Sequence, residues 1–167
     1  MTSDYWSRRR GLEYYKQATD WVKEHTLAGD SVIDIGGGVT TGCRYLAWLP
    51  EHERTSVELR WGDYELDGVR VIESRFEDWE PDKKYDIAIC LQCAEHVEDP
   101  WSFIQKIRSI SDKMILSLPY KWGADQEAGH LHDPIDDVDI LRWVGREPTA
   151  SKLFGHHLWR RWIGLYL

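Results

Sequence analysis

The sequence has few cysteines, no long apolar run and no excess of positive charge, and each absence narrows the range of functions. Its three cysteines, Cys43, Cys90 and Cys93, are an odd number without regular spacing, which argues against a disulfide-stapled secreted domain. No apolar stretch approaches the ~20 residues that a membrane-spanning helix requires, and the N-terminal MTSDYWSRRRGLEYY has no signal-peptide core. We therefore expect a cytoplasmic protein that does not enter a membrane.

The balance of charge is acidic, with a formal net charge of -8 at pH 7. An acidic surface repels phosphate backbones, which argues against nucleic acid as a partner. The expected partner is a small molecule, and a homodimer is compatible with the sequence. Ten tryptophans are many for 167 residues, and they either enlarge a small core or line a pocket for a flat or sugar-like substrate.

The sequence contains no repeats and no linker, so we expect one domain over residues 1–167. An amphipathic helix is predicted over residues 4–26, capped by Asp4, with Tyr14, Ala18, Trp21 and Val22 on one face. Further helices are predicted through Tyr45, Leu46 and Leu49, from Asp99-Pro100 to Ile110, and over residues 134–144. Strands are predicted at residues 31–35, 55–59, 69–72, 85–91, 113–118, 151–155 and 162–167, the last two as an antiparallel pair. This alternation is typical of an α/β fold with a parallel sheet, although the connection over residues 60–68 is too short for a full crossover helix.

The first strand runs directly into a glycine turn, Gly36-Gly37-Gly38, where the backbone can approach a ligand closely. Glu58 lies near the end of the second strand, and a carboxylate at that place can accept both hydroxyls of a ribose. A dinucleotide fingerprint would need glycine at Thr41. Asp34 would also repel a pyrophosphate, whereas it suits a sulfonium ligand that carries an amino group. The pattern therefore favours S-adenosylmethionine over NAD.

Two segments, VIDIGGG (Val32 to Gly38) and YDIAICLQCAEHVEDP (Tyr85 to Pro100), resemble the class I S-adenosylmethionine-dependent methyltransferases of the small-molecule branch. The resemblance implies a Rossmann-like, doubly wound, mostly parallel seven-stranded sheet whose last strand is antiparallel. It also implies a helical cover (1–27), a cofactor-binding core (28–120), and a substrate loop with a C-terminal hairpin (121–167). The resemblance implies that Asp34, Gly36, Gly37 and Gly38 border the amino-acid portion of the cofactor and that Glu58 holds the ribose. It implies that Arg75 and Phe76 flank adenine, Phe76 by stacking or through its backbone N–H. It places Leu91 and Gln92 at the methionine side, with His96 close by.

The substrate side of this fold follows the fifth strand, where we expect Tyr120 and Trp122 to line the acceptor site. His130, His132 and Asp133 form the richest constellation there, and His96 is a further catalytic candidate. One histidine oriented by a carboxylate would serve as a general base for a hydroxyl acceptor on a sugar or natural-product intermediate. The alternatives are a divalent metal held by His130, His132 and Asp133, and histidines that merely cap the next helix. We favour the base, without a metal.

Two other classes of protein remain open at this point. The chain could be a catalytically degenerate module that binds S-adenosylmethionine or S-adenosylhomocysteine as a partner subunit, or it could be an NAD or nucleotide-sugar enzyme. We also expect the first helix to close over the cofactor, with Tyr5, Trp6 and Arg10 reaching its carboxylate.

Overall fold

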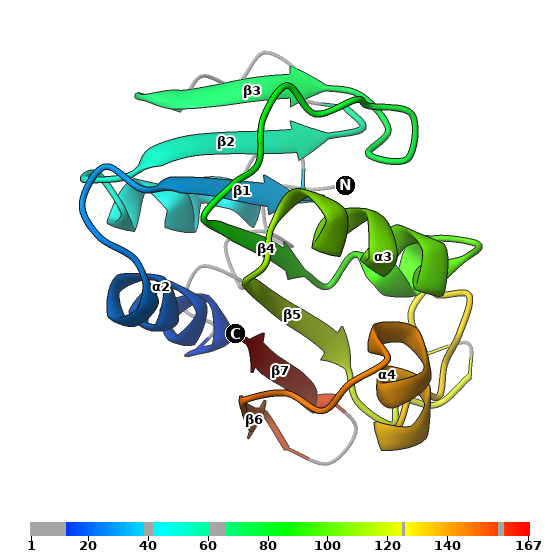
Figure 1. Ribbon diagram of the computed structural model, residues 1–167. Helices are drawn as coiled ribbons and strands as arrows, with labels where there is room; N and C mark the ends of the chain where they lie inside the picture. The colour runs from blue at the N-terminus through cyan, green and yellow to red at the C-terminus, as the bar shows by residue number, and fades with distance from the viewer. Residues whose placement is uncertain (1–12, 39–41, 61–65, 125, 157–158) are drawn as a thin grey trace.

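The computed structural model describes residues 13–38, 42–60, 66–124, 126–156 and 159–167, and its centre is one twisted sheet (Figure 1). The sheet has seven strands in the order β3-β2-β1-β4-β5-β7-β6. Pairing is parallel from β3 to β5, whereas β7 is antiparallel to both β5 and β6. The predicted α/β class, the seven strands and the antiparallel hairpin at the end are confirmed.

The strands are β1 (Ser31–Ile35), β2 (Glu53–Glu58), β3 (Val69–Glu73), β4 (Ile87–Leu91), β5 (Met114–Pro119), β6 (Ala150–Phe154) and β7 (Arg161–Tyr166). The helices are α2 (Glu13–His25), η1 (Gly42–Trp48), η2 (Ala94–His96), α3 (Pro100–Ile110) and α4 (Asp137–Val144).

Alternate residues of the strands enter two separate hydrophobic layers, one on each face of the sheet. On one face, α2 and η1 pack against residues such as Val32, Ile87 and Ile89. On the other, α3 and α4 cover residues such as Ile33 and Cys90. The central strands β1, β4 and β5 are buried throughout, which explains their nearly continuous apolar sequences.

The helices differ from the predictions mainly at their ends. The described part of the first helix begins at Glu13, and its predicted face of Tyr14, Ala18, Trp21 and Val22 is buried as expected. Asp4, Tyr5, Trp6 and Arg10 lie outside the described residues.

The segment after the glycine turn is a 3-10 helix rather than an α-helix. Tyr45 and Leu46 of this helix and Leu49 just after it are buried and spaced by three and four, a pattern that does not separate the two helix types. The last helix begins at Asp137, later than the predicted Pro134, because Asp136 caps it with a reciprocal capping box.

Candidate active site

The glycine turn lies between the carboxyl ends of β1 and β4, where the order of the sheet reverses direction. Gly36 and Gly38 have φ angles of 71° and 77°, which favour glycine. A Cβ atom on Gly36 would lie 2.2 Å from the Cys93 sulfur, so the turn from β1 contacts the segment after β4. The backbone N–H of Gly36 also donates to the Val57 carbonyl at 2.9 Å.

The sequence predicts that Glu58 and the glycine turn bind the same cofactor. In the structure the two are in direct contact. One carboxylate oxygen of Glu58 accepts from the Gly38 N–H at 2.7 Å, and the other accepts from the Leu59 N–H at 2.9 Å. The Glu58 carboxylate thus lies at the rim of the turn, 20 residues away along the chain.

Asp34 is fully buried, and its carboxyl group is held inside the protein. The Tyr45 hydroxyl donates to one oxygen at 2.5 Å and the Ser56 hydroxyl donates to the other at 3.2 Å. Burial raises the pKa of Asp34 to about 7, with a smaller contribution from the nearby Glu58 charge. Asp34 therefore links β1 to η1 and β2, and both of its oxygens are occupied by these hydroxyls.

The expected adenine flank after β3 differs between its two residues. The Arg75 side chain is exposed and forms ion pairs with Glu77 at 3.3 Å and Asp78 at 3.8 Å. The Phe76 ring is buried and packs edge-on against Phe103, with the ring centroids 5.1 Å apart. Stacking of adenine on Phe76 is therefore not available, because the ring belongs to the core.

Two residues directly after β4 and β5 have left-handed backbones without being glycine. Gln92 has φ 54° and Lys121 has φ 55°. Such residues are uncommon and gather at functional sites. Gln92 is held to β5, because its backbone N–H and its side-chain amide both donate to Ser117 at 2.8 Å. Leu91 is buried in the layer beneath α2 and η1. Lys121 lies in the segment after the fifth strand that the sequence predicts for the substrate side, between Tyr120 and Trp122.

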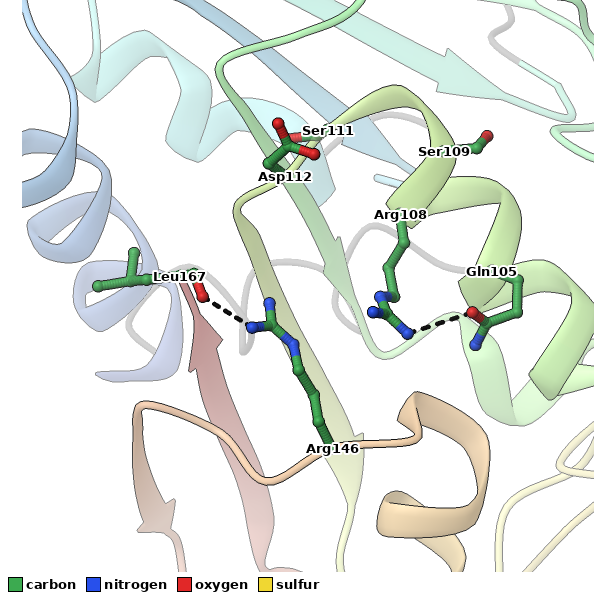
Figure 2. Close-up of a pocket in the computed structure, with 7 residues that line it drawn as sticks. All are labelled: Gln105, Arg108, Ser109, Ser111, Asp112, Arg146 and Leu167. Atoms are coloured by element: carbon green, nitrogen blue, oxygen red, sulfur yellow. Dashed lines mark hydrogen bonds between the residues drawn. The ribbon is translucent and has the colours of Figure 1, made fainter.

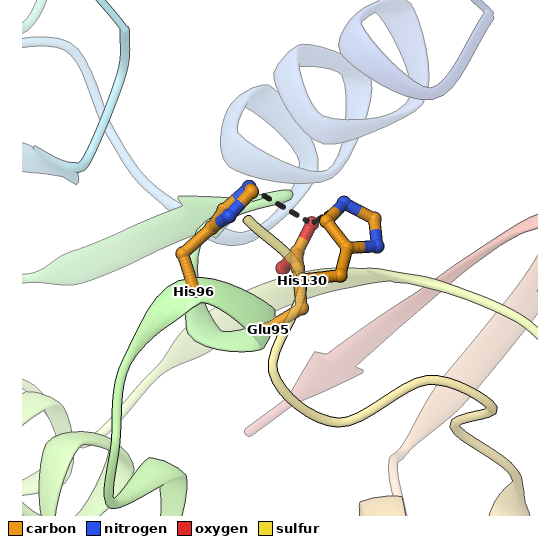
Figure 3. A group of neighbouring side chains, drawn as sticks. All are labelled: Glu95, His96 and His130. Carbon is orange, nitrogen blue, oxygen red and sulfur yellow. Dashed lines mark ion pairs between the residues drawn. The ribbon is translucent and has the colours of Figure 1, made fainter. Parts of the chain in front are cut away.

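Glu95, His96 and His130 form one cluster beyond the end of β4 (Figure 3), and Asp133 adjoins it through His130. Nδ1 of His130 lies 2.7 Å from an oxygen of Asp133, and these side chains are 5% and 3% exposed. Nε2 of His130 lies 3.9 Å from Oε1 of the buried Glu95. Nε2 of His96 lies 4.0 Å from the same oxygen, while its Nδ1 lies 2.8 Å from the Gly129 carbonyl. The structure thus joins three of the four predicted catalytic residues.

His132 is not part of this cluster. Its Nε2 lies 2.7 Å from the Val97 carbonyl, and its ring packs edge-on against Trp143. Glu95 belongs to the cluster instead. The sequence did not predict Glu95 as a site residue, although it immediately precedes His96. The direction of each ring depends on partners from α4 and from the segment after β4, which residue spacing does not reveal.

The two predicted substrate residues also separate. Trp122 stacks on His130 with ring centroids 5.4 Å apart, and the half-exposed Trp159 packs edge-on against Trp122 at 4.9 Å. Tyr120 instead donates its hydroxyl to Asp137 at 2.7 Å and so anchors α4. The aromatic wall beside the cluster is therefore Trp122 and Trp159.

Cys90 lies in β4, and Cys93 follows its end. A hydrogen bond with Cys90, together with burial, raises the pKa of the Cys93 thiol well above its usual range. A neutral, buried thiol is a poor metal ligand and a poor nucleophile, which agrees with small side chains packed beside a strand end.

An open pocket of about 520 Å³ lies elsewhere, at the amino end of β5 (Figure 2). Arg108 and Arg146 line it, but both guanidinium groups already donate to carbonyl oxygens, those of Val144 and Leu167. Ligands of doubly wound sheets bind at the carboxyl ends of the strands, so this pocket is separate from the candidate site. Among the described helices, none is both long and apolar enough to cross a membrane.

Residues 5–150 match the model of a methyltransferase domain. The chain belongs to this methyltransferase family. The resemblance of the two sequence segments to class I methyltransferases is thereby confirmed. A comparison with curated proteins finds no similar sequence.

Solved structures share the fold of this methyltransferase at low identity. The N-methyltransferase NodS from Bradyrhizobium japonicum WM9, in complex with S-adenosylhomocysteine, is 10% identical with a TM-score of 0.74 over 99% of this chain and 92% of its own. Magnesium protoporphyrin IX methyltransferase from Synechocystis PCC 6803, with bound S-adenosylhomocysteine, is 17% identical with a TM-score of 0.69 over 92% and 80%. The N-terminal domain of EvdMO1, in the presence of S-adenosylhomocysteine and D-fucose, is 13% identical with a TM-score of 0.65 over 92% and 82%.

Proposed function

We propose that this methyltransferase transfers the methyl group of S-adenosylmethionine to a hydroxyl of a small molecule, with His130 as the general base. The family supplies the reaction class. The observation that carries the choice of a hydroxyl is the buried His130–Asp133 pair beyond the end of β4. A hydroxyl acceptor needs a group that removes its proton, whereas an amine or a thiolate needs little more than placement.

The cofactor site of the proposal is the turn at Gly36, Gly37 and Gly38 with the Glu58 carboxylate at its rim. Close approach of the backbone at the glycines suits the amino-acid portion of the cofactor, and Glu58 suits its ribose diol. The charge of Asp34, held by Tyr45 and Ser56, favours a cation at this turn. When bound, S-adenosylmethionine supplies a methyl group on a positively charged sulfur, ready for in-line displacement.

His130 is built to accept a proton at Nε2. With the Nδ1 proton donated to Asp133, the tautomer leaves the Nε2 lone pair free, and the carboxylate stabilises the imidazolium that forms. Stacking on Trp122 keeps the ring in place. The proposed role of His130 is to take the acceptor's hydroxyl proton at Nε2; the acceptor oxygen would then displace S-adenosylhomocysteine from the methyl carbon.

A sugar or a related natural-product intermediate is the proposed acceptor class. Trp159 offers a half-exposed ring beside Trp122, and indole faces suit the apolar side of a sugar ring. One structural neighbour was crystallised in the presence of D-fucose. Another is an N-methyltransferase, so the fold alone does not choose the acceptor, and the proposal relies on the histidine pair.

Binding and turnover test the proposal separately. We expect calorimetry to detect S-adenosylhomocysteine and not NAD, and methyl-labelled S-adenosylmethionine to label hydroxylated acceptors from a panel of sugars and glycosides. The variant His130→Ala should lose about 100-fold or more in kcat, because a positioned base contributes roughly 10²–10⁴-fold. Its affinity for S-adenosylhomocysteine should stay within about twofold of the parent's.

The matched control is His132→Ala, which removes an imidazole from the same loop but outside the cluster. It should keep kcat within roughly threefold of the parent, well below the loss expected for a base. Undiminished kcat in His130→Ala would reject the base. Tight S-adenosylhomocysteine binding with no turnover on any acceptor would favour the binding module instead.

A further inference from the structure

We propose that Glu95, His96 and His130 form a binding site for a divalent transition-metal ion of the zinc type. Two imidazole nitrogens and one carboxylate oxygen, all within 4.8 Å of one another, face a common point among the described residues. Glu95 and His96 belong to η2, whereas His130 lies in the segment between β5 and α4. Glu95 and His130 are 35 residues apart in the sequence. Figure 3 shows the three side chains converging on one another.

Both histidine rings are oriented by a second partner, so that the same nitrogen of each points inward. Nδ1 of His130 is bound to Asp133, and Nδ1 of His96 is bound to the Gly129 carbonyl. Each Nδ1 therefore carries its proton toward an acceptor, which leaves the Nε2 lone pair of each ring for a metal. Metal-binding histidines almost always donate their other N–H to a carboxylate or a carbonyl in this way.

The distances fit a site that closes slightly around an ion. Oε1 of Glu95 lies 3.9 Å from Nε2 of His130 and 4.0 Å from Nε2 of His96. With metal–ligand bonds of about 2.0–2.2 Å, donor atoms of a tetrahedral site lie roughly 3.3 Å apart. The donor atoms are now up to 4.8 Å apart, so side-chain movements on the order of 1 Å would bring the three donors to that spacing.

Burial gives the site an inner wall and an entrance. Glu95 and His130 are 1% and 5% exposed, whereas the His96 side chain is 44% exposed. A buried carboxylate beside two imidazoles lowers the free energy of a bound cation, because little water screens the charge. The exposed side at His96 provides a path by which an ion can enter.

The donor set indicates the class of metal. Imidazole with carboxylate suits zinc, iron, cobalt and nickel, while magnesium and calcium prefer oxygen ligands alone. Three protein ligands leave at least one position for water or for an acceptor oxygen, as in catalytic zinc sites. An ion bound here would occupy the His130 Nε2 that the proposed base uses, so His130 could act as the base only in the metal-free protein.

Cobalt(II) is the probe for the test, because its visible absorption reports a site of low coordination number. The full-length protein, without cofactor or acceptor, is titrated with cobalt and then with zinc as a competitor. We expect one equivalent of cobalt to produce the absorption and zinc to displace it. The variants His96→Ala and His130→Ala should abolish the absorption, and Asp133→Asn should weaken cobalt binding about 10–100-fold. The control His132→Ala should bind cobalt like the parent.

Absence of the absorption at stoichiometric cobalt would overturn the proposal, as would its survival in both His96→Ala and His130→Ala, or its loss in His132→Ala. Calorimetry with S-adenosylhomocysteine on the same samples identifies folded variants. If a variant still binds S-adenosylhomocysteine but has lost the cobalt absorption, it has lost a metal-binding side chain rather than its fold. The half-exposed His96 gives a second ligand variant with little effect on packing. Cobalt binding without nucleoside binding by the parent would reject the proposed function and leave the metal site standing.

Discussion

Burial of a single carboxyl group, that of Asp34, links the cofactor turn to the stability of the protein. Its pKa is raised from an ordinary 3.8 to about 7, mainly by burial. Between these two values the unfolded chain loses a proton that the folded protein keeps. The free energy of unfolding therefore falls as the pH rises through this range. The total loss, complete above about pH 7, is about 4 kcal/mol.

The variant Asp34→Asn should remove this dependence, since an amide of the same shape does not ionise. Relative to the parent, its free energy of unfolding should increase as the pH rises from about 4 to about 7 and then level off. Urea unfolding at a series of pH values measures the difference. A difference between variant and parent that does not change with pH would contradict the assignment.

Substitution of Glu58 should weaken binding of the cofactor's ribose. The variant Glu58→Gln keeps the shape of the side chain but loses the charge that strengthens hydrogen bonds to ribose hydroxyls. The loss of charge-assisted bonds is worth about 1.5–3 kcal/mol, which corresponds to roughly 10–100-fold weaker binding of S-adenosylhomocysteine. Calorimetry measures the change.

Glu53 provides the control for Glu58, because it begins the same strand and pairs with Lys83 on the surface. The variant Glu53→Gln removes one charge from the amino end of β2, the opposite end of the strand from Glu58. Its affinity for S-adenosylhomocysteine should match the parent's. Equal losses in the two variants would mean that net charge, rather than contact with the ribose, accounts for the effect.

At the scale of elements, the junction between β1 and β4 depends on a glycine that leaves room for a neighbour. In the variant Gly36→Ala, the new methyl group meets Cys93, and an L-residue must adopt a φ of 71°. Left-handed strain and overpacking each cost roughly 1–3 kcal/mol, so unfolding should be easier by a few kcal/mol. Chemical denaturation measures this loss.

A double variant separates the two causes at this junction. Replacing Cys93 by alanine removes the sulfur that a Cβ on Gly36 would meet at 2.2 Å, although the Cys93 Cβ remains at 2.9 Å. The cost of Gly36→Ala should therefore be smaller in the Cys93→Ala background. An equal cost in both backgrounds would assign the whole effect to the backbone.

The elements themselves were predictable wherever local signals agreed. Val32 to Ile35 lie in a central strand with an apolar run before glycines, and Asp99-Pro100 begins α3 with the Asp99 side chain accepting from the Ser102 N–H. Element boundaries were less predictable, because the reciprocal cap at Asp136 and the 3-10 geometry near Tyr45 depend on details of hydrogen bonding that similar spacings share.

At the scale of the whole molecule, the parallel strands place segments distant in the sequence at one edge of the sheet. A ligand that joins the glycine turn, Glu58 and the segment after β4 should stabilise the entire domain. At 100 times its dissociation constant, S-adenosylhomocysteine should add about 2.7 kcal/mol to the free energy of unfolding. For a domain of this size, Tm should rise by about 5–10 °C.

Thermal melts with NAD at the same concentration are the comparison for this shift. NAD shares the adenosine portion but carries a pyrophosphate, which an ionised Asp34 beside the turn disfavours. Its effect on Tm should be below about 1 °C, far less than a saturating ligand gives. A larger shift with NAD than with S-adenosylhomocysteine would reject the choice of cofactor.

The sequence by itself determined the order of strands and helices, the glycine turn and the family, because these follow from short-range patterns of apolar residues, glycines and caps. Only the tertiary structure decided which side chains meet. It buried Phe76 in the core, enclosed Asp34 between Tyr45 and Ser56, turned His132 toward Val97, and set Glu95 beside His130. Ring and carboxylate directions depend on partners from distant elements, and only the packing of those elements on the sheet specifies them.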